Sequence, residues 1–307
     1  MNEFLEKVIK NGQYYGKKIL LLARKLRYKI QPVHLQQPIF VVGCSRAGST
    51  LVYKTFSEAA SLGSLQRETH DFWAKLQPIA KRNWESHAIP QHLATKNKRA
   101  AVEQYFYTQT GKRRIVDKNN QNGLSIAYLY QLFPDAHFVY IKRSAGDNIN
   151  SLIHGWNKAD EFATWSADLP KKVAIEQGKY QRWCFFLTKG WQDYCHQPIE
   201  AVCAFQYQTM NRAILTAKVA IPTTQWHEIS YETLIENPVS EFKQLFEVCG
   251  VEFDANLREH CEQVLQKPYN TFSEIKVDKW KTGENSQKIS TILNEIEDVV
   301  IDMGYKK

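Results

Sequence analysis

Short apolar runs alternate with longer segments of helical periodicity along most of this chain. The runs are rich in β-branched and aromatic residues, as buried strands require, and they lie at 38–42, 113–117, 137–141 and 224–229. Helical spacing of apolar residues follows over 49–59, 122–132, 149–156, 173–196, 198–218, 238–249 and 286–303, with a more polar helical stretch at 75–110. Strands that alternate with helices predict an α/β fold with a parallel sheet and helices on both faces. Ligands of such sheets bind beyond the carboxyl ends of the strands.

The first thirty residues show a different pattern. Residues 3–30 predict one helix in which lysine and arginine residues are interleaved with apolar residues. Such a helix can lie on an anionic bilayer, or it can pack on the domain with a solvated basic face. Pro32 and Pro38 bracket a short linker. We therefore expect a basic amphipathic arm at 1–32 and one domain at 38–307, with helical insertions at 71–112 and 157–218.

Composition limits the classes of protein that this chain can represent. Its 307 residues suffice for a full core, and a net charge of +8 suits an anionic ligand, nucleic acid or an acidic membrane surface. The six cysteines form no C-x-x-C pair and no metal-ligand spacing with histidine, so we expect reduced thiols and no metal. There is neither a run of about eighteen apolar residues nor a signal-peptide layout, which predicts a cytoplasmic protein.

A loop of small residues connects the first predicted strand to its helix. It begins at Gly43 and continues through Cys44, Ser45, Arg46, Ala47, Gly48, Ser49 and Thr50. Backbone N–H groups converge at a strand–loop–helix junction of this kind, and the helix dipole favours an anion. The loop therefore predicts a phosphate site, with a tight turn that binds nothing as the alternative.

The position of the loop cation separates the known phosphate loops. A nucleotide-triphosphatase loop reads G-x-x-x-x-G-K-[ST], but Ser49 stands where its lysine belongs. A cysteine-based phosphatase needs an arginine six residues after Cys44, and Thr50 is there. With Arg46 inside it, the loop resembles the 5′-phosphosulfate loop of the sulfotransferases, which runs close to G-x-P-[RK]-[ST]-G-[ST]-T. Two positions depart from that pattern, because Ser45 replaces the proline and Ala47 replaces a hydroxyl residue.

A second motif follows the third predicted strand and strengthens this resemblance. Sulfotransferases have an arginine at a strand end and a serine eight residues later that hold the 3′-phosphate of the cofactor, and Arg143 and Ser151 have this spacing. A guanidinium is a planar, permanently charged donor for a phosphate, and a hydroxyl adds another donor. Tyr231 resembles the family tyrosine that lies against the adenine ring. Lys279, Trp280 and Lys281 resemble a late K-W-[KR] segment that closes the nucleotide pocket.

The resemblance covers about residues 38–305 and implies a P-loop-like sulfotransferase fold. It also implies transfer of a sulfuryl group from 3′-phosphoadenosine 5′-phosphosulfate (PAPS) to an acceptor hydroxyl or amine, with 3′-phosphoadenosine 5′-phosphate (PAP) as product. Arg46 and the loop would stabilise charge on the leaving phosphate. Glu68 is the candidate base and His70 the competing one. Lys118 and Lys276 are further candidates for contact with the sulfuryl group, but we expect both to be surface charges.

The acceptor is expected to be a small molecule, a glycan or a lipid, selected by the segments at 71–112 and 157–218. One alternative is a P-loop-like nucleotide kinase, although the missing loop lysine and the lack of an evident acidic Mg²⁺ site argue against it. The other is a basic module that docks an anionic surface without chemistry. Because the aromatic residues show no ordered stacking motif, we expect no nucleic-acid partner.

Overall fold

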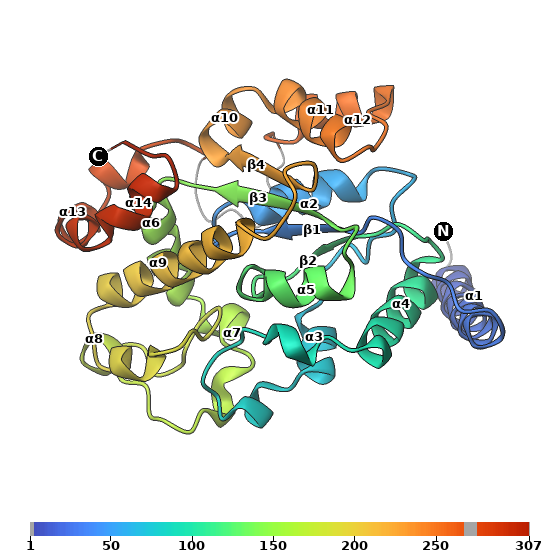
Figure 1. Ribbon diagram of the computed structural model, residues 1–307, viewed down its shortest axis with the longest axis horizontal. Helices are drawn as coiled ribbons and strands as arrows, with labels where there is room; N and C mark the ends of the chain where they lie inside the picture. The colour runs from blue at the N-terminus through green and yellow to red at the C-terminus, as the bar shows by residue number, and fades with distance from the viewer. Residues whose placement is uncertain (1–2, 267–274, 307) are drawn as a thin grey trace.

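Four short parallel strands form the central sheet of the computed structural model, which describes residues 3–266 and 275–306 (Figure 1). In chain order they are β1 (Ile39–Val42), β2 (Val116–Lys118), β3 (His137–Lys142) and β4 (Trp226–Ser230). Their spatial order is β2-β1-β3-β4, so that Ile39 of β1 lies opposite Val116 on one side and His137 on the other. Because the strands are parallel, the loops at their carboxyl ends meet at one edge. The predicted α/β fold with a parallel sheet is confirmed.

Alternate strand residues point to the two faces of the sheet, and each face is covered by helices (Figure 1). The face of Ile39 and Val41 shares its core with α2 (Ser49–Ser57), α10 (Tyr231–Glu236), α11 (Pro238–Val248) and α12 (Ala255–Gln263). The larger core of Phe40 and Val42 includes α3 (His70–Leu76), α4 (Lys96–Thr110), α5 (Ile126–Leu132), α6 (Ala145–Trp156), α9 (Ile199–Lys218), α13 (Ser286–Leu293) and α14 (Glu297–Asp302). Helices on both faces leave the strand ends as the open edge of the sheet.

The long helix predicted over 173–196 is wrong. Only α8 (Ile175–Gly178) and a short 3-10 helix, η5 (Trp191–Tyr194), form there. Trp183, Phe185 and Phe186 are all buried in the chain between them, and Phe185 has a φ of 68° that no α-helix accommodates. Periodicity misled the prediction because these aromatic side chains fill the core from an irregular backbone.

Smaller differences concern the ends and continuity of other elements. The polar stretch at 75–110 contains the 3-10 helices η1 (Ile79–Arg82) and η2 (Gln91–Leu93) before α4 begins, each of them preceded by a proline. The segment at 286–303 divides into α13, η7 (Asn294–Ile296) and α14. Short helices also occupy the segments around the open edge, namely η3 (Asn122–Ser125), α7 (Ala159–Phe162), η4 (Ser166–Asp168) and η6 (Lys279–Thr282).

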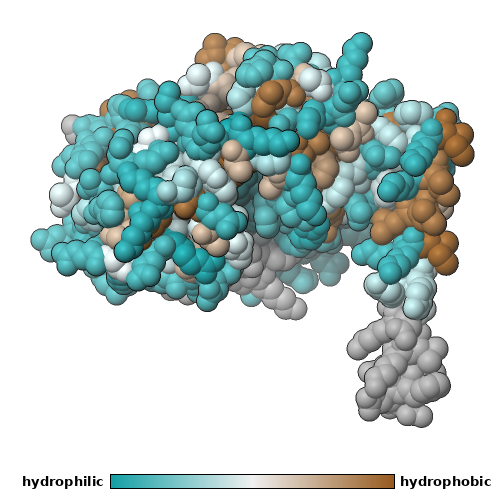
Figure 2. Space-filling model, turned by 90° about the horizontal axis from the view of Figure 1, so that it is seen from below, coloured by the Kyte–Doolittle hydropathy of each residue, from teal (hydrophilic) through white to brown (hydrophobic). Residues whose placement is uncertain are grey.

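The N-terminal helix α1 (Glu3–Ile30) lies beside α4 and projects from the domain (Figures 1 and 2). Hydrogen bonds to α4 attach the C-terminal part of α1 to the domain. The Tyr28 hydroxyl donates to the Ala100 carbonyl at 3.1 Å, and Arg24 Nη1 donates to the Gln109 carbonyl at 3.1 Å. Of the helices in the described ranges, none combines the length and apolar character that crossing a membrane requires.

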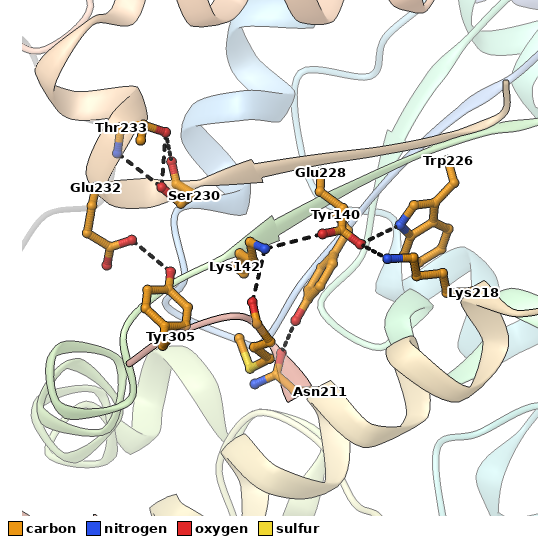
Figure 3. Close-up of polar contacts among 11 residues, drawn as sticks. Tyr140, Lys142, Asn211, Lys218, Trp226, Glu228, Ser230, Glu232, Thr233 and Tyr305 are labelled. Carbon is orange, nitrogen blue, oxygen red and sulfur yellow. Dashed lines mark hydrogen bonds and ion pairs between the residues drawn. The ribbon is translucent and has the colours of Figure 1, made fainter. Parts of the chain in front are cut away.

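The C-terminal segment is fixed to the edge of the sheet by polar contacts (Figure 3). Lys142 Nζ, at the end of β3, donates to the Met303 carbonyl at 3.0 Å. The Tyr305 hydroxyl donates to Glu232 Oε2 at 2.7 Å, and Oε1 of the same carboxylate accepts the Ser144 N–H at 2.9 Å. These contacts join the C-terminal segment, the start of α10 and the loop after β3. They hold that loop in place at the carboxyl edge of the sheet.

Candidate active site

A pocket of about 270 Å³ opens at the carboxyl edge of the sheet. The ends of all four strands contribute to its wall, through Arg46 after β1, Lys118 in β2, Arg143 after β3 and Tyr231 after β4. Lys279 adds a fourth cation, while the carboxylates among the described wall residues are Glu68 and Glu161. Cations therefore outnumber carboxylates in this wall, and the pocket favours an anionic ligand.

Two glycines fix the path of the loop between β1 and α2. Gly48 caps α2 with a φ of 102°, a left-handed conformation that other residues rarely adopt. A Cβ added at Gly48 would lie 2.6 Å from the Tyr231 ring, and one added at Gly43 would lie 2.6 Å from the Ile141 carbonyl oxygen. The loop is therefore pressed against β3 and α10, with no room for a side chain at either glycine.

The remaining loop residues divide between the pocket and the core. Those in the pocket wall, together with Gly48, are Ser45, Arg46, Ser49 and Thr50. Cys44 and Ala47 are buried beneath the loop. Burial raises the pKa of the Cys44 thiol well above its usual range, so the thiol is protonated at neutral pH and is a packing residue rather than a nucleophile.

Arg143 joins the end of β3 to this loop. Its Nη1 donates to the Arg46 carbonyl at 3.0 Å, and its guanidinium lies over the Tyr231 ring at 4.2 Å from the centroid. The Arg143 side chain is almost completely buried, and its Nε has no hydrogen-bond partner among the described residues. An unpaired buried N–H of a charged group is costly, and a ligand acceptor that reached this atom would remove that cost.

Two more polar groups of the wall surround the same space. Ser45 Oγ is buried and, within residues 3–266 and 275–306, has no hydrogen-bond partner. Arg46 Nε donates to Ser151 Oγ at 3.4 Å. Burial, and then the nearby charge of Arg143, lowers the pKa of Arg46 to about 10, so the Arg46 guanidinium is still charged at neutral pH. An anion placed between them would relieve this repulsion. Ser151 and Arg143, both expected from the sequence, thus lie beside the loop.

Lys118 stands between the loop and Glu68. Its Nζ is 2.5 Å from Glu68 Oε1 and 3.5 Å from Thr50 Oγ1, and the residue is buried. The expectation of a surface charge at Lys118 is therefore wrong, whereas Lys276 is exposed. Burial raises the pKa of Glu68, but the charge and hydrogen bond of Lys118 outweigh it and hold the pKa below the usual range. Glu68 is ionised at neutral pH.

Asp117 fixes the segment that contains Glu68 and His70. Its completely buried carboxyl group accepts hydrogen bonds from the Thr69 hydroxyl at 2.6 Å, Trp73 Nε1 at 3.0 Å and Asn122 Nδ2 at 3.1 Å. Burial raises the pKa of Asp117 despite these donors. His70 follows Thr69 directly and is exposed at the start of α3, where it lines the pocket. Both candidate bases thus lie in the wall, held by one buried network.

The three late residues expected at the nucleotide separate in space. Lys279 lines the pocket. Trp280 packs over Gly146 in the first turn of α6, where a Cβ would collide with its ring. Lys281 forms an ion pair with Asp278 at 2.8 Å and is exposed. Of the three, the structure brings Lys279 to the pocket, while Trp280 packs on α6 outside the pocket wall.

Part of the wall was not singled out by the sequence analysis. These residues come from α6, α7 and the irregular chain after α7, and they are His154, Glu161, Phe162, Thr164 and Phe185. No motif contains them. His154 lies in a predicted helix, and the signal for the other four was their placement within 157–218, which was expected to select the acceptor.

The fold also brings together three ligand-type side chains away from the pocket. Atoms of His137, His227 and Cys249 lie within 4.8 Å of one another, although their spacing in the sequence suggested no metal set. His137 Nδ1 and His227 Nε2 are 3.0 Å apart and share a hydrogen bond. Burial raises the pKa of the Cys249 thiol to about 12, so the thiol is protonated at neutral pH.

Comparisons with known proteins agree with the fold described above. A model of the sulfotransferase family matches residues 38–255. The sulfotransferase domain of the Synechococcus PCC 7002 olefin synthase superposes with a TM-score of 0.52 at 16% identity, over 90% of this chain and 97% of that one. Sulfotransferase STF9 from Mycobacterium avium gives a TM-score of 0.53 at 12% identity, over 89% and 80% of the two chains. A search of curated proteins finds no match.

The contact between Gly48 and Tyr231 is testable with a matched pair of variants. Gly48 and Gly178 have similar φ values of 102° and 95°, but a Cβ at Gly178 meets nothing within 4 Å. We expect Gly178→Ala to lower the free energy of unfolding by about 1 kcal/mol through backbone strain. Gly48→Ala should lower it by about 2–4 kcal/mol, because the Tyr231 ring must also move. Urea unfolding measures both values, and equal losses would contradict the contact.

Proposed function

The chain belongs to the sulfotransferase family, and we propose that it transfers a sulfuryl group from PAPS to a hydroxyl or amine of an acceptor. The observation that supports this donor most directly is that both phosphate motifs, the loop at 43–50 and Arg143 with Ser151, line one pocket. The buried, unpaired Arg143 Nε and Ser45 Oγ fit a ligand that offers phosphate oxygens on both sides.

Each motif has its own part in this proposal. The loop N–H groups with Ser49 and Thr50 hold the 5′ side of PAPS at the N-terminus of α2, and Arg143 with Ser151 holds the 3′-phosphate. When bound, PAPS supplies the sulfuryl group and a phosphate leaving group. Arg46 stabilises the negative charge that develops there, because its guanidinium is already in place and largely buried.

Glu68 is the proposed base for an acceptor hydroxyl. The carboxylate is ionised at neutral pH and its segment is fixed by Asp117, so it presents an oxygen at a defined place in the wall. Lys118 neutralises part of that charge and lies close to Thr50 of the loop. His70, which is exposed at the start of α3, is the alternative base. The segments 71–112 and 157–218 are proposed to select a small molecule, glycan or lipid acceptor.

Calorimetric titration tests the donor. We expect PAP to bind at micromolar Kd or tighter, and ADP, which lacks the 3′-phosphate, to bind at least tenfold more weakly. Arg143→Ala should remove about 1.5–3 kcal/mol of PAP binding and abolish the preference for PAP over ADP. Arg258→Ala, a change at an exposed arginine of α12, should leave both affinities unchanged. Tighter binding of ATP with Mg²⁺ would support a nucleotide kinase instead, and no nucleotide binding would support a docking module.

The identity of the base is tested by PAP release from PAPS, with water or an added alcohol as acceptor. We expect Glu68→Gln to lower the rate by about 10²- to 10⁴-fold and His70→Gln to lower it less than tenfold. Because the pKa of Glu68 is lowered, the carboxylate is present above that pKa, and activity should persist from neutral pH to below the ordinary range of a glutamate. The reverse ranking of the two variants would assign the base to His70.

We further propose that α1 lies on an anionic membrane surface and that the protein is cytoplasmic. Apolar side chains gather on the projecting helix (Figure 2), and those in one stripe at helical spacing are Tyr15, Ile19, Leu22, Leu26 and Ile30, each at least 52% exposed. This stripe points away from α4, because Arg24 and Tyr28 contact α4 from the opposite side. Exposed lysines at 18, 25 and 29 run along its flank. That residues 1–32 form a separate arm remains a prediction.

Vesicle sedimentation tests this membrane contact. We expect the protein to sediment with phosphatidylcholine vesicles that contain phosphatidylserine, and less with pure phosphatidylcholine. The double variant Leu22→Glu/Leu26→Glu should lose this binding. Val219→Glu, a change at an apolar residue that is 89% exposed next to α9, should keep it. If the unchanged protein stays in the supernatant with both vesicle types, the proposed contact is wrong.

A further inference from the structure

A second pocket of about 360 Å³ adjoins the first one. The two pockets share His70, Gln121 and Trp165 as wall residues. His70 lies two residues after Glu68, so the junction is next to the proposed base. A molecule in the second pocket can therefore present a reacting group to the first without contacting the two phosphate motifs.

The walls of the second pocket are mainly aromatic and aliphatic. The side chains that give it this character are Trp73, Pro78, Ile79, Trp84, Ile89 and Trp165. Trp73 is held by its bond to Asp117, and Trp165 contacts the His87 ring edge-on with 4.6 Å between centroids. Rigid aromatic walls of this kind favour a ligand with a flat, apolar body.

Arg82 interrupts these apolar walls. The residue lines the pocket, and its Nη1 donates to the Gln77 carbonyl at 3.1 Å. The Arg82 Nε is buried and lacks a hydrogen-bond partner in the part of the chain that the structure describes. The acidic residue among the described wall residues, Asp168, is exposed. A guanidinium in an otherwise apolar wall favours a ligand that brings an oxyanion.

His87 supplies a second donor in the same wall. Its Nδ1 accepts the Leu187 N–H at 2.8 Å, so the ring proton lies on Nε2. Burial, with a smaller effect from the charge of Arg82, lowers the pKa of His87 to about 3, and the ring is neutral at pH 7. Beside Arg82, this neutral N–H favours an oxygen-rich group over an ammonium group.

We propose that the second pocket selects an acceptor that has an aromatic or apolar body, a hydroxyl at the Glu68 end and a carboxylate at Arg82. This inference rests on the proposed function. In the transfer, the acceptor oxygen forms a bond to sulfur while its proton goes to Glu68. The bond between sulfur and the phosphate oxygen breaks, and PAP leaves with that electron pair. The substrate class is therefore an aromatic hydroxy acid, and Arg82 is its specificity-determining residue.

Two probes that differ only in charge test this class. The first is 3-(4-hydroxyphenyl)propanoate and the second is its primary amide, each supplied with PAPS while PAP formation is followed. We expect kcat/KM for the acid to exceed that for the amide by at least tenfold. Arg82→Leu and Arg82→Gln should remove this preference through KM for the acid, with kcat changed less than threefold and the amide nearly unaffected. Arg82→Lys should restore part of it.

The control is Lys81→Leu, which removes an exposed charge next to Arg82 and should leave the preference intact. PAP titration of every variant separates the two proposals. A protein that fails to bind PAP contradicts the proposed donor. A protein that binds PAP, but shows equal kcat/KM for the two probes or accepts neither, overturns the inference about the acceptor.

Discussion

The stacked contact of Gly48, Tyr231 and Arg143 is the constraint on which the rest of the site depends. The tyrosine ring lies against Gly48 on one side and beneath the Arg143 guanidinium, whose Nη1 in turn holds the Arg46 carbonyl. Through these contacts β3, β4 and the loop after β1 fix one another at the carboxyl edge. The C-terminal segment supports the loop after β3 from outside, through the contact of Tyr305 with Glu232 (Figure 3). The two phosphate motifs therefore have a set separation before any ligand arrives.

This arrangement costs folding stability and supplies binding energy. Arg46 and Arg143 are buried close to each other, Lys118 is buried beside the loop, and Arg143 Nε lacks an acceptor in the described part of the chain. Buried like charges and unpaired donors each oppose folding, and an anion that neutralises them binds the native state alone. A doubly phosphorylated nucleotide should accordingly stabilise the protein strongly. In the second pocket, Arg82 Nε likewise has no acceptor in the described part of the chain, and the other wall residues are mainly apolar. An oxyanion bound there should also stabilise the native state.

The sequence predicted much of the fold because the strands and the loops after them are encoded locally. β1 and β3 form within a residue of the predicted ranges, and α2 begins at Ser49, where the predicted helix begins. Local patterns failed where tertiary packing decides, as in the irregular aromatic chain at 173–196. They also failed at Lys118 and Arg82. The contact of Lys118 with Glu68 and the place of Arg82 in the wall of an apolar pocket exist only in three dimensions.

A crystal structure of the protein with PAP tests the central claim most directly. The account predicts one phosphate at the loop of residues 45–50 and the 3′-phosphate on Arg143, with Nε and Ser151 Oγ within hydrogen-bond distance of its oxygens. The second pocket should stay open beside Glu68. PAP bound elsewhere, or with the 3′-phosphate away from Arg143, would contradict the claim that these two motifs form a single nucleotide site.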